Sequence, residues 1–553
     1  MLMVATGGLC ALAGAVSCWR VSLVPTVDLT EADAVVGLDW LRSARCGVRP
    51  GAVPDAWADR NSGVSPVILT IWRRGKRQGA LQVDGEAPAR ALPKLAQLLR
   101  DVPQLCGASD VRLQLDVAVG IGALPQSGPG FALGFVEGRD GAVATVAGAR
   151  VFVPPNALIS ARATEAFKPV PTVEPGLKLG ASIEKVQQTL KTQAMALRIS
   201  PGEIGPVSRF RSATAVEGAS GQLRILRKSN TLRAPPDRAA LQASALAGAT
   251  YLANSQHSNG KFRYAWAPVD DRSAQRGYSW VRHSGVVWSL SLVGRILERP
   301  RFFDSADRGI VALKPQLIDG PQGSRCVRSK SNCYVGGTAL ALLGVTEHRA
   351  SSGSEAHADM AASMGTFLRS MQRPDGTFIH QWRGKTGPDD SRMYPYASQQ
   401  AVLALAFHGR ISGDRASLDA AERGMDFLAG EYWDHFLGRW FVAQEHWTAI
   451  AVEELQRSRP KPEYVELCWK IGTFYGGLLL PEHGTPFSED VGGVGVGPVL
   501  TPHLGATSTM VEAMISAVEV GDAAGKDTTV LRAQVASGLA QLVGGQVTVH
   551  DTF

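Results

Sequence analysis

QHSNGKFRYAW (residues 256–266) and QRPDGTFIHQW (residues 372–382) are two copies of one motif, Q-x-x-(N/D)-G-x-F-x-x-x-W, that lie about 116 residues apart. Each copy is followed by a pair of aspartates, a tyrosine and an apolar segment of helical length. The glycine predicts a left-handed turn residue, and we expect the phenylalanine to pack that turn. A repeat at this spacing predicts several copies of one structural unit.

Around the two copies, eleven segments carry apolar residues at helical spacing. They are 238–254, 281–297, 303–316, 334–347, 355–373, 394–411, 416–430, 444–457, 461–479, 503–520 and 526–543. Amphipathic segments alternate with segments that are almost entirely apolar. An amphipathic helix covers an edge, whereas a helix that is apolar all round is buried on both sides. The alternation predicts an α/α toroid of about eleven to twelve helices over residues 238–553.

The sequence before the toroid indicates two further parts, which makes the chain multidomain. Residues 28–200 contain short β-branched runs broken by glycine, which predict an α+β domain with mostly antiparallel strands. Its expected helices are 32–45, 88–99, 157–167 and 182–196. Residues 201–237 are rich in Ser, Gly, Arg and Pro and predict an interdomain linker, with GQLRILRK as a candidate strand pair.

The first 18 residues carry no charged side chain and resemble the apolar core of a secretory signal. The end of this run resembles a bacterial lipobox, in which Cys18 would be lipidated and serve as a lipid anchor. We expect an exported protein, periplasmic or membrane-anchored; the alternative is an apolar N-terminal strand in a cytoplasmic protein. An exported chain would also accommodate disulfides, with Cys326–Cys333 and Cys46–Cys106 as candidate pairs.

Charge and motifs exclude several functions. The formal net charge of +7 is spread over 553 residues, and the basic cluster at 73–77 is expected to be a solvated hairpin turn, with a polyanion contact as the alternative. The cluster lacks interleaved aromatic residues, so we expect no nucleic-acid partner. The sequence contains no nucleophile elbow, phosphate loop, H-E-x-x-H helix or zinc-ligand spacing, and we predict no metal or cofactor.

The residues that enter the inner helices are the candidates for chemistry. Inner helices of a toroid run in one direction, so their N-terminal ends should gather at one mouth. The predicted catalytic residues are Asp271, His283, Glu445 and His446. The predicted substrate-binding residues are Tyr278, Trp280, Arg282, Tyr334, Asp390, Tyr394, Tyr396, Trp447 and His503. Aromatic rings with carboxylates, imidazoles and a guanidinium are the mixture that a sugar site needs.

Structural roles remain open for the same residues. Turn formation and helix capping would explain the aspartate pairs at 270–271 and 389–390. Packing at the helix entry would explain Tyr394 and Tyr396. Arg282 and His283 begin an otherwise apolar helix, and Glu445 and His446 lie in an aromatic run, so a function is expected there first.

The alternating helices and the Q-x-x-D-G-x-F hairpins resemble the six-hairpin and α/α-toroid glycosidases, lyases and uronyl epimerases. Prenyltransferase and terpene-cyclase toroids carry similar turns, but the zinc site and Asp-rich motif of those enzymes are absent here. Residues 60–170 resemble the AMME-syndrome candidate family, through VILTIWRRGKRQGALQV, DVRLQLDVAVG and GRDGAVATVAGARVFVPPNAL. The Arg and Cys of that family's core motif are absent, so no functional residue is carried over.

The resemblance to the toroid enzymes implies hydrolysis, elimination or epimerisation of a polysaccharide or oligosaccharide that can contain uronates, with the site at the toroid mouth. The alternative is a catalytically silent scaffold that binds a glycan or a protein in a bacterial envelope assembly. In either case the N-terminal domain is the candidate contact for an envelope protein partner.

Overall fold

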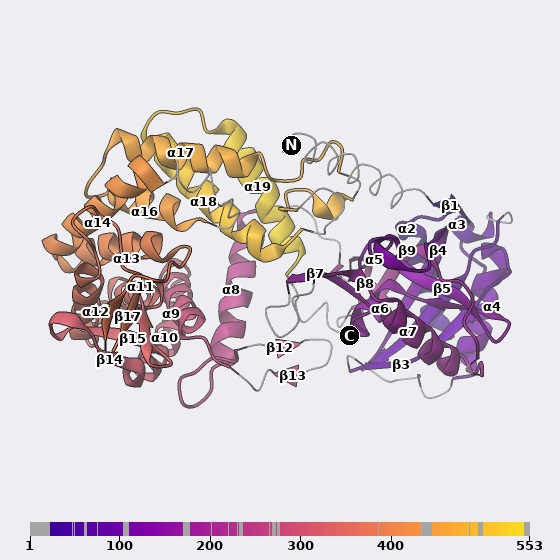
Figure 1. The fold of residues 1–553 in the computed structure, drawn as a ribbon. Helices are drawn as coiled ribbons and strands as arrows, with labels where there is room; N and C mark the ends of the chain where they lie inside the picture. Colours follow the sequence, from indigo (N-terminus) through magenta and orange to yellow (C-terminus); the bar gives the residue numbers. More distant parts are fainter. Residues whose placement is uncertain are drawn as a thin grey trace.

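The computed structural model contains a β-rich N-terminal domain and a helical C-terminal domain (Figure 1). It describes residues 23–46, 48, 50–59, 63–74, 76–102, 105, 110–169, 177–200, 202–218, 221–228, 230–231, 236–264, 266–267, 272–273, 277–384, 386–432, 445–485, 487–495 and 502–546. The predicted signal, with Cys18, lies outside these residues. Among the residues described, no helix is long and apolar enough to cross a membrane.

The N-terminal domain is built on one antiparallel sheet. Its strands are β1 (Val24–Pro25), β2 (Val67–Arg73), β3 (Lys76–Val83), β4 (Val111–Ala123), β5 (Asp140–Val146), β6 (Ala149–Val153), β9 (Ser208–Glu217), β10 (Leu223–Arg227) and β11 (Asn230–Thr231). The main path runs β11-β10-β9-β4-β2-β3, and β5 with β6 branches from β9. The basic cluster lies at the β2–β3 hairpin, where Arg73 and Arg74 both pair with Asp110.

Two apolar cores flank this sheet. The first joins β2, β4 and β9 to α2 (Glu31–Arg42) and α4 (Pro88–Arg100), with the short α3 (Asp55–Ala58) at its edge. The second joins β5 and β6 to α5 (Gly128–Ala132), α6 (Pro155–Ser160) and α7 (Ile183–Ala196). Beside α6, β7 (Thr164–Pro169) pairs with β8 (Leu177–Ala181), so the predicted helix 157–167 is shorter than expected and turns into a strand.

The predicted linker 201–237 contains three strands, β9, β10 and β11; β10 lies in GQLRILRK, where a strand pair was a candidate, and β9 was not expected. Strand β9 pairs with β4 and is central to the sheet. Its arginines made the segment look like a solvated connection. In the fold, Arg209 and Arg211 both bind the carboxylate of Asp140, and the Arg209 side chain is fully buried. A paired charge of this kind is compatible with burial.

The C-terminal domain is the predicted α/α toroid, and each of the eleven predicted segments contains a helix. The outer helices are α8 (Arg238–Asn254), α10 (Pro300–Leu313), α12 (Ala358–Ser370), α14 (Arg415–Phe427), α17 (Pro462–Gly476) and α19 (Thr529–Gly544). The inner helices are α9 (Trp280–Ile296), α11 (Val335–Ser352), α13 (Ala397–Ser412), α16 (Trp447–Gln456) and α18 (Leu504–Ala523). Consecutive inner helices pack side by side around the ring.

The repeated motif joins each hairpin to the next outer helix. In the first copy the Gln256 side chain donates to the backbone carbonyl of Ser305 on α10, at 2.9 Å. In the second copy Gln372 donates to the carbonyl of Ala420 on α14, at 2.8 Å. An arginine of the same outer helix donates back to each glutamine oxygen, Arg308 in the first copy and Arg423 in the second.

The backbone geometry of these turns explains why the motif has a glycine at this position. Gly260 has a φ of +79° and Gly376 a φ of +91°, in the left-handed region that glycine adopts without strain. A Cβ at either glycine would meet the backbone carbonyl oxygen of Arg308 or Arg423, respectively. The motif phenylalanines are buried as expected. The repeat therefore builds the toroid, and its most regular residues are structural.

A five-stranded antiparallel sheet at the entry of α11 and α13 was missed by the sequence patterns. It comprises β14 (Leu317–Asp319), β15 (Arg325–Ser329), β16 (Asn332–Tyr334), β17 (Gln381–Arg383) and β18 (Gly387–Asp389). A smaller ribbon, β12 (Trp266–Ala267) with β13 (Arg272–Ser273), follows the first motif copy. These strands are only two to five residues long, too short for a periodic signal.

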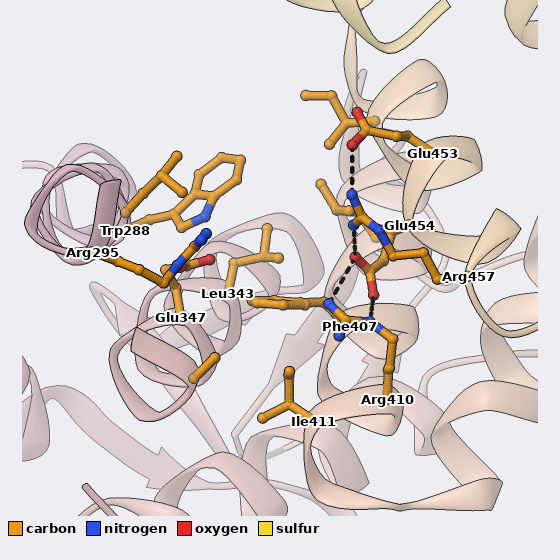
Figure 2. Close-up of a pocket in the computed structure, with 14 residues that line it drawn as sticks. Trp288, Arg295, Leu343, Glu347, Phe407, Arg410, Ile411, Glu453, Glu454 and Arg457 are labelled. Atoms are coloured by element: carbon orange, nitrogen blue, oxygen red, sulfur yellow. Dashed lines mark hydrogen bonds and ion pairs between the residues drawn. The ribbon is translucent and has the colours of Figure 1, made fainter. Parts of the chain in front are cut away.

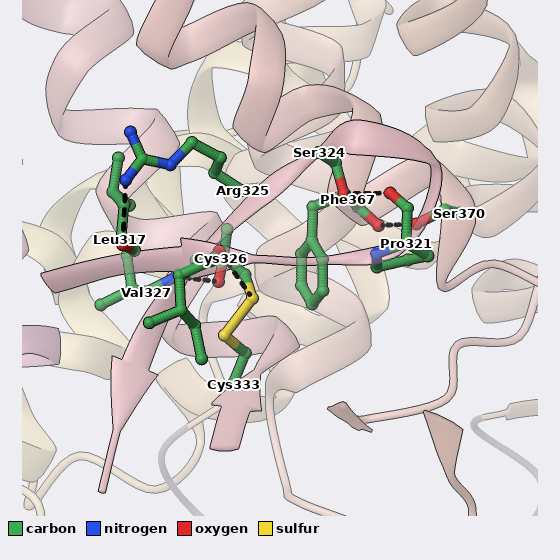
Figure 3. Close-up of a disulfide and its surroundings, with 11 residues drawn as sticks. Leu317, Pro321, Ser324, Arg325, Cys326, Val327, Cys333, Phe367 and Ser370 are labelled. Atoms are coloured by element: carbon green, nitrogen blue, oxygen red, sulfur yellow. Dashed lines mark hydrogen bonds between the residues drawn. A yellow bond between two sulfur atoms is a disulfide. The ribbon is translucent and has the colours of Figure 1, made fainter. Parts of the chain in front are cut away.

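The predicted Cys326–Cys333 disulfide is present and links β15 to β16 next to Phe367 (Figure 3). Cys46 is also disulfide-bonded, and Cys106, its predicted partner, lies outside the described residues. The disulfide in the sheet closes a short loop immediately before α11. It therefore holds the start of this inner helix in place.

The toroid contacts the N-terminal domain through the segment 487–490. The Phe487 ring lies beneath three cationic groups of the N-terminal domain, those of Arg139, Arg211 and Lys228. Arg139 also forms an ion pair with Glu489, two residues after Phe487, at 2.5 Å. The same segment continues to Val494, whose N–H donates to the hydroxyl of Thr507 on α18. The N-terminal domain thus supports the entry of the last inner helix.

Candidate functional site

The N-terminal ends of α9 and α11 form an aromatic mouth. The rings of Tyr278 and Trp280 lie with their centroids 5.0 Å apart, and Lys261 approaches both of them. Tyr278, Trp280 and Tyr334 line a cavity of about 490 Å³. Tyr394 lies outside the cavity lining and packs edge to face on Tyr334, with ring centroids 4.8 Å apart. Four of the predicted aromatic residues, Tyr278, Trp280, Tyr334 and Tyr394, therefore lie close together at this mouth.

His283, a predicted catalytic residue, lies beneath this mouth with both ring nitrogens occupied. Nε2 lies 2.8 Å from the carbonyl oxygen of Gly309, so Nε2 is the protonated nitrogen. Nδ1 then accepts from the hydroxyl of Tyr278, at 2.7 Å. Burial lowers the pKa of His283, and its side chain is only 2% exposed. In this arrangement His283 is neutral and positions Tyr278.

Three other predicted residues have structural partners. Asp390 forms an ion pair with Arg373 of the second motif copy, at 2.5 Å. The His503 ring caps α18, because its Nδ1 accepts from the backbone N–H of Ala506. Arg282 donates to the hydroxyl of Tyr264 and remains at the surface. Asp271, a predicted catalytic residue, lies outside the described residues.

Glu445 is a buried carboxyl group at the entry of α16. Its Oε1 accepts from the N–H of Thr448 at 3.0 Å, whereas Oε2 is buried and has no hydrogen-bond partner. Burial raises the pKa of Glu445 to about 7, and the hydrogen bond from Thr448 acts in the opposite direction. The pKa of the neighbouring Tyr396 is raised by burial and by Glu445. The carboxyl group can therefore hold a proton near neutral pH.

Tyr396 adopts a strained backbone at the start of α13. Its φ is +75°, a value that is rare for a bulky side chain. Strain of this kind costs about 1–3 kcal/mol and is often found at functional sites. The predicted residues Tyr396 and Glu445 therefore belong to one environment at the mouth, where α13 and α16 begin.

At the same entry of α16, His446 and Trp447 face residues from two other inner helices. The Trp447 ring lies 4.2 Å from the His446 ring and 6.1 Å from that of Trp288 on α9, centroid to centroid. The His446 Nε2 lies 3.5 Å from the Glu512 carboxylate on α18. Because α9, α16 and α18 each contribute, these side chains meet inside the ring.

Glu512 combines access to solvent with a raised pKa. Its side chain is 48% exposed, so solvent reaches it. Burial by the surrounding helices, together with Glu453, raises the pKa of Glu512, although water screens part of this effect. Glu453 is held by the hydroxyl of Ser516 at 2.8 Å. His446 and Glu512 form a pair suited to proton transfer, and we call it the lumen pair.

The C-terminal halves of four inner helices enclose a second cavity, of about 510 Å³ (Figure 2). It is lined by Trp288 on α9, Leu343 on α11, Phe407 on α13 and Glu453 on α16, among others. The first cavity is lined by the N-terminal ends of α9 and α11, and the second cavity is lined by the C-terminal halves of the same two helices. These two inner helices therefore run in the same direction. The second cavity therefore lies at the opposite end of the ring.

Sequence patterns pointed to the mouth and missed Glu512, Glu453 and Trp288. A signal for the carboxylates was present, because Glu512 interrupts the apolar run ATSTMVEAMISAV and Glu453 the run TAIAVEEL. A carboxylate on a nearly apolar inner helix needs a partner or water, so it marks the interior of the ring. Among the residues described, no cluster of His, Cys, Asp or Glu could hold a metal ion.

The fold and the site define an α/α toroid with titratable groups and stacked aromatic rings inside the ring. Similar solved structures include a sugar epimerase from a ruminal bacterium, 12% identical, covering 55% of this chain and 84% of that one, with a TM-score of 0.43. A cellobiose 2-epimerase from Bacillus thermoamylovorans B4167 is 11% identical, covering 54% and 85%, with a TM-score of 0.43. The GH76A α-1,6-mannanase from Salegentibacter sp. HEL1_6 is 12% identical, covering 51% and 99%, with a TM-score of 0.35.

These similar structures are carbohydrate-active enzymes, the class that the toroid pattern resembles. No protein-family model and no curated protein matches the sequence. The resemblance of residues 60–170 to the AMME-syndrome candidate family therefore stays without support.

Proposed function

We propose that this protein is a carbohydrate-active enzyme that moves a proton on a saccharide inside the toroid, as an epimerase or a lyase. The observation that carries the proposal is the lumen pair, with an imidazole nitrogen 3.5 Å from a solvent-exposed carboxylate. Stacked indole rings lie beside the pair and provide the flat apolar surface on which sugar rings pack.

In this proposal neutral His446 removes a proton from a sugar carbon next to a carbonyl or carboxylate group. The C–H electron pair moves into the activated group, and Glu512 stabilises the imidazolium that forms. In epimerisation a proton from water is delivered to the opposite face of the same carbon, and the imidazolium releases its proton to solvent. In elimination the leaving group departs from the neighbouring carbon, and a double bond remains.

Proton transfer is better supported than hydrolysis. Hydrolysis of a glycoside uses two carboxyl groups that flank the bond. Here the solvent-exposed carboxylate of Glu512 is paired with an imidazole. Glu445, the other carboxyl group with a strongly raised pKa, is fully buried.

The proposal is tested by incubating the protein with oligosaccharides in deuterated water. Epimerisation incorporates deuterium at a sugar carbon, and elimination yields an unsaturated product that absorbs ultraviolet light. We expect His446→Gln and Glu512→Gln each to slow turnover by about a hundredfold or more. His483→Gln, at an exposed histidine of the loop after α17, is the matched control and should leave turnover unchanged. Glycan binding without any turnover in the unmodified protein would instead identify a silent glycan-binding scaffold.

A further inference from the structure

The cavity at the C-terminal end of the ring carries two charged clusters on opposite sides (Figure 2). On one side Arg295 of α9 lies 3.4 Å from Glu347 of α11. On the other side Arg410 of α13 and Arg457 of α16 share the carboxylate of Glu454. Leu343 and Phe407 lie between the clusters. The cavity therefore combines an apolar floor with charged sides.

The two charge types are unequally exposed. The side chains of Arg295 and Arg457 are each 51% exposed and that of Arg410 is 32% exposed, whereas those of Glu347 and Glu454 are each 6% exposed and that of Glu453 is 26% exposed. The carboxylates lie behind the guanidinium groups and neutralise them, so the arginines can line a cavity without mutual repulsion. A ligand that enters meets guanidinium N–H groups first.

These guanidinium groups keep donors for a ligand. A guanidinium has five N–H donors in a planar fork that matches a carboxylate. One guanidinium nitrogen of Arg457 donates to Glu454 at 2.7 Å and another donates to Glu453 at 2.9 Å. Arg295 makes only long contacts of 3.3–3.4 Å, with Glu347 and Ser351. Arg295 is therefore the arginine that can turn toward a ligand at the least cost.

The floor of the cavity continues to the lumen pair. Trp288 lines the cavity and stacks on Trp447, which packs on His446. A ring-shaped ligand held by the arginines would lie on apolar and aromatic side chains that lead to the proposed acid–base residues. The requirement is a molecule with a flat apolar face and an anionic group.

We infer that this cavity is a subsite for a carboxylate-bearing saccharide, with Arg295 binding the carboxylate, Arg457 adding positive charge on the facing side and Trp288 packing against the sugar ring. The inference rests on the proposed function in taking the ligand to be a saccharide. It further specifies that the substrate is anionic, and it places the binding subsite at the end of the ring opposite the aromatic mouth.

The test measures binding of uronate-bearing oligosaccharides from pectin, alginate, chondroitin and heparosan, each beside its carboxyl-reduced counterpart. We expect at least one uronate oligosaccharide to bind and its reduced counterpart to bind about ten- to a hundredfold more weakly. Binding should weaken with added salt. The double variant Arg295→Gln/Arg457→Gln should lose the preference for the carboxylate. Arg459→Gln, which removes an arginine paired with α14 outside the cavity, is the matched control and should keep it.

Binding of both forms with equal affinity, no binding of any oligosaccharide in the set, or an unchanged preference in the folded double variant would each overturn the inference. Thermal melting establishes that each variant is folded. The outcome is separate from that of the proposed function: His446→Gln should abolish turnover and preserve the carboxylate preference. A protein that binds uronates and never turns them over would refute the enzyme and leave the subsite intact.

Discussion

Replacing Glu445 by glutamine should remove a pH dependence from the stability of the toroid. Glutamine keeps the shape of the side chain and an oxygen that can accept from the N–H of Thr448. It removes the group that must ionise as the pH rises. Because burial raises the pKa of Glu445 to about 7, the folded protein binds this proton more tightly than the unfolded chain.

The magnitude follows from the two pKa values. The ordinary value is 4.5 and the folded value about 7. At about 1.4 kcal/mol per pH unit, the difference amounts to about 3 kcal/mol. The contribution is fully present below pH 4.5 and is lost as the pH rises through about 7. Glu445→Gln should therefore gain stability relative to the unmodified protein by about 3 kcal/mol between about pH 4.5 and pH 8.

Urea unfolding at a series of pH values, followed by tryptophan fluorescence, measures this difference. Glu482→Gln, at an exposed loop position, is the control and should show a flat difference over the same range. A flat difference for Glu445→Gln as well would refute the conclusion that the folded protein holds this proton.

Three further predictions concern the parts of the fold that support the site. Gly376→Ala should cost about 3 kcal/mol in chemical unfolding, because its Cβ meets a backbone carbonyl, whereas Gly413→Ala, with a φ of +76° and open space, should cost about 1 kcal/mol. Cys326→Ser should lower the free energy of unfolding by about 2–3 kcal/mol, and a reducing agent should then have little further effect on the melting of the toroid. Phe487→Ala should remove contacts of about 0.5–1 kcal/mol each and accelerate limited proteolysis between the domains, and an unchanged cleavage rate would contradict the proposed docking role.

The toroid was predictable because its signals are local. Helical spacing is set within one or two turns, and the alternation of apolar and amphipathic helices reports which of them is covered on both sides. The motif glycines and phenylalanines act within one hairpin and its next helix, so two copies in the sequence were enough to identify the unit. The Cys326–Cys333 pair is likewise separated by only seven residues.

The end of the N-terminal domain was harder to predict, because its last strands pair with residues that are distant in the sequence. Strand β9 contains Arg209 and Arg211, which look solvent-exposed until Asp140 of β5 is placed beside them. The pairing of β9 with β4 joins residues about ninety positions apart. No local pattern contains this information, so the sequence predicts a linker where the central strand β9 lies.

The candidate site divides in the same way. The sequence by itself placed Tyr278, Trp280 and Tyr334 at one mouth, because helix direction determines which ends gather. Only the tertiary structure shows the partners of these side chains. Both ring nitrogens of His283 are hydrogen-bonded, to Tyr278 and Gly309, and Glu512 lies beside His446. A helix period determines which face of one helix is buried. Which side chains of different helices meet inside the ring depends on their axial and rotational positions, and these are set only when the whole ring packs together.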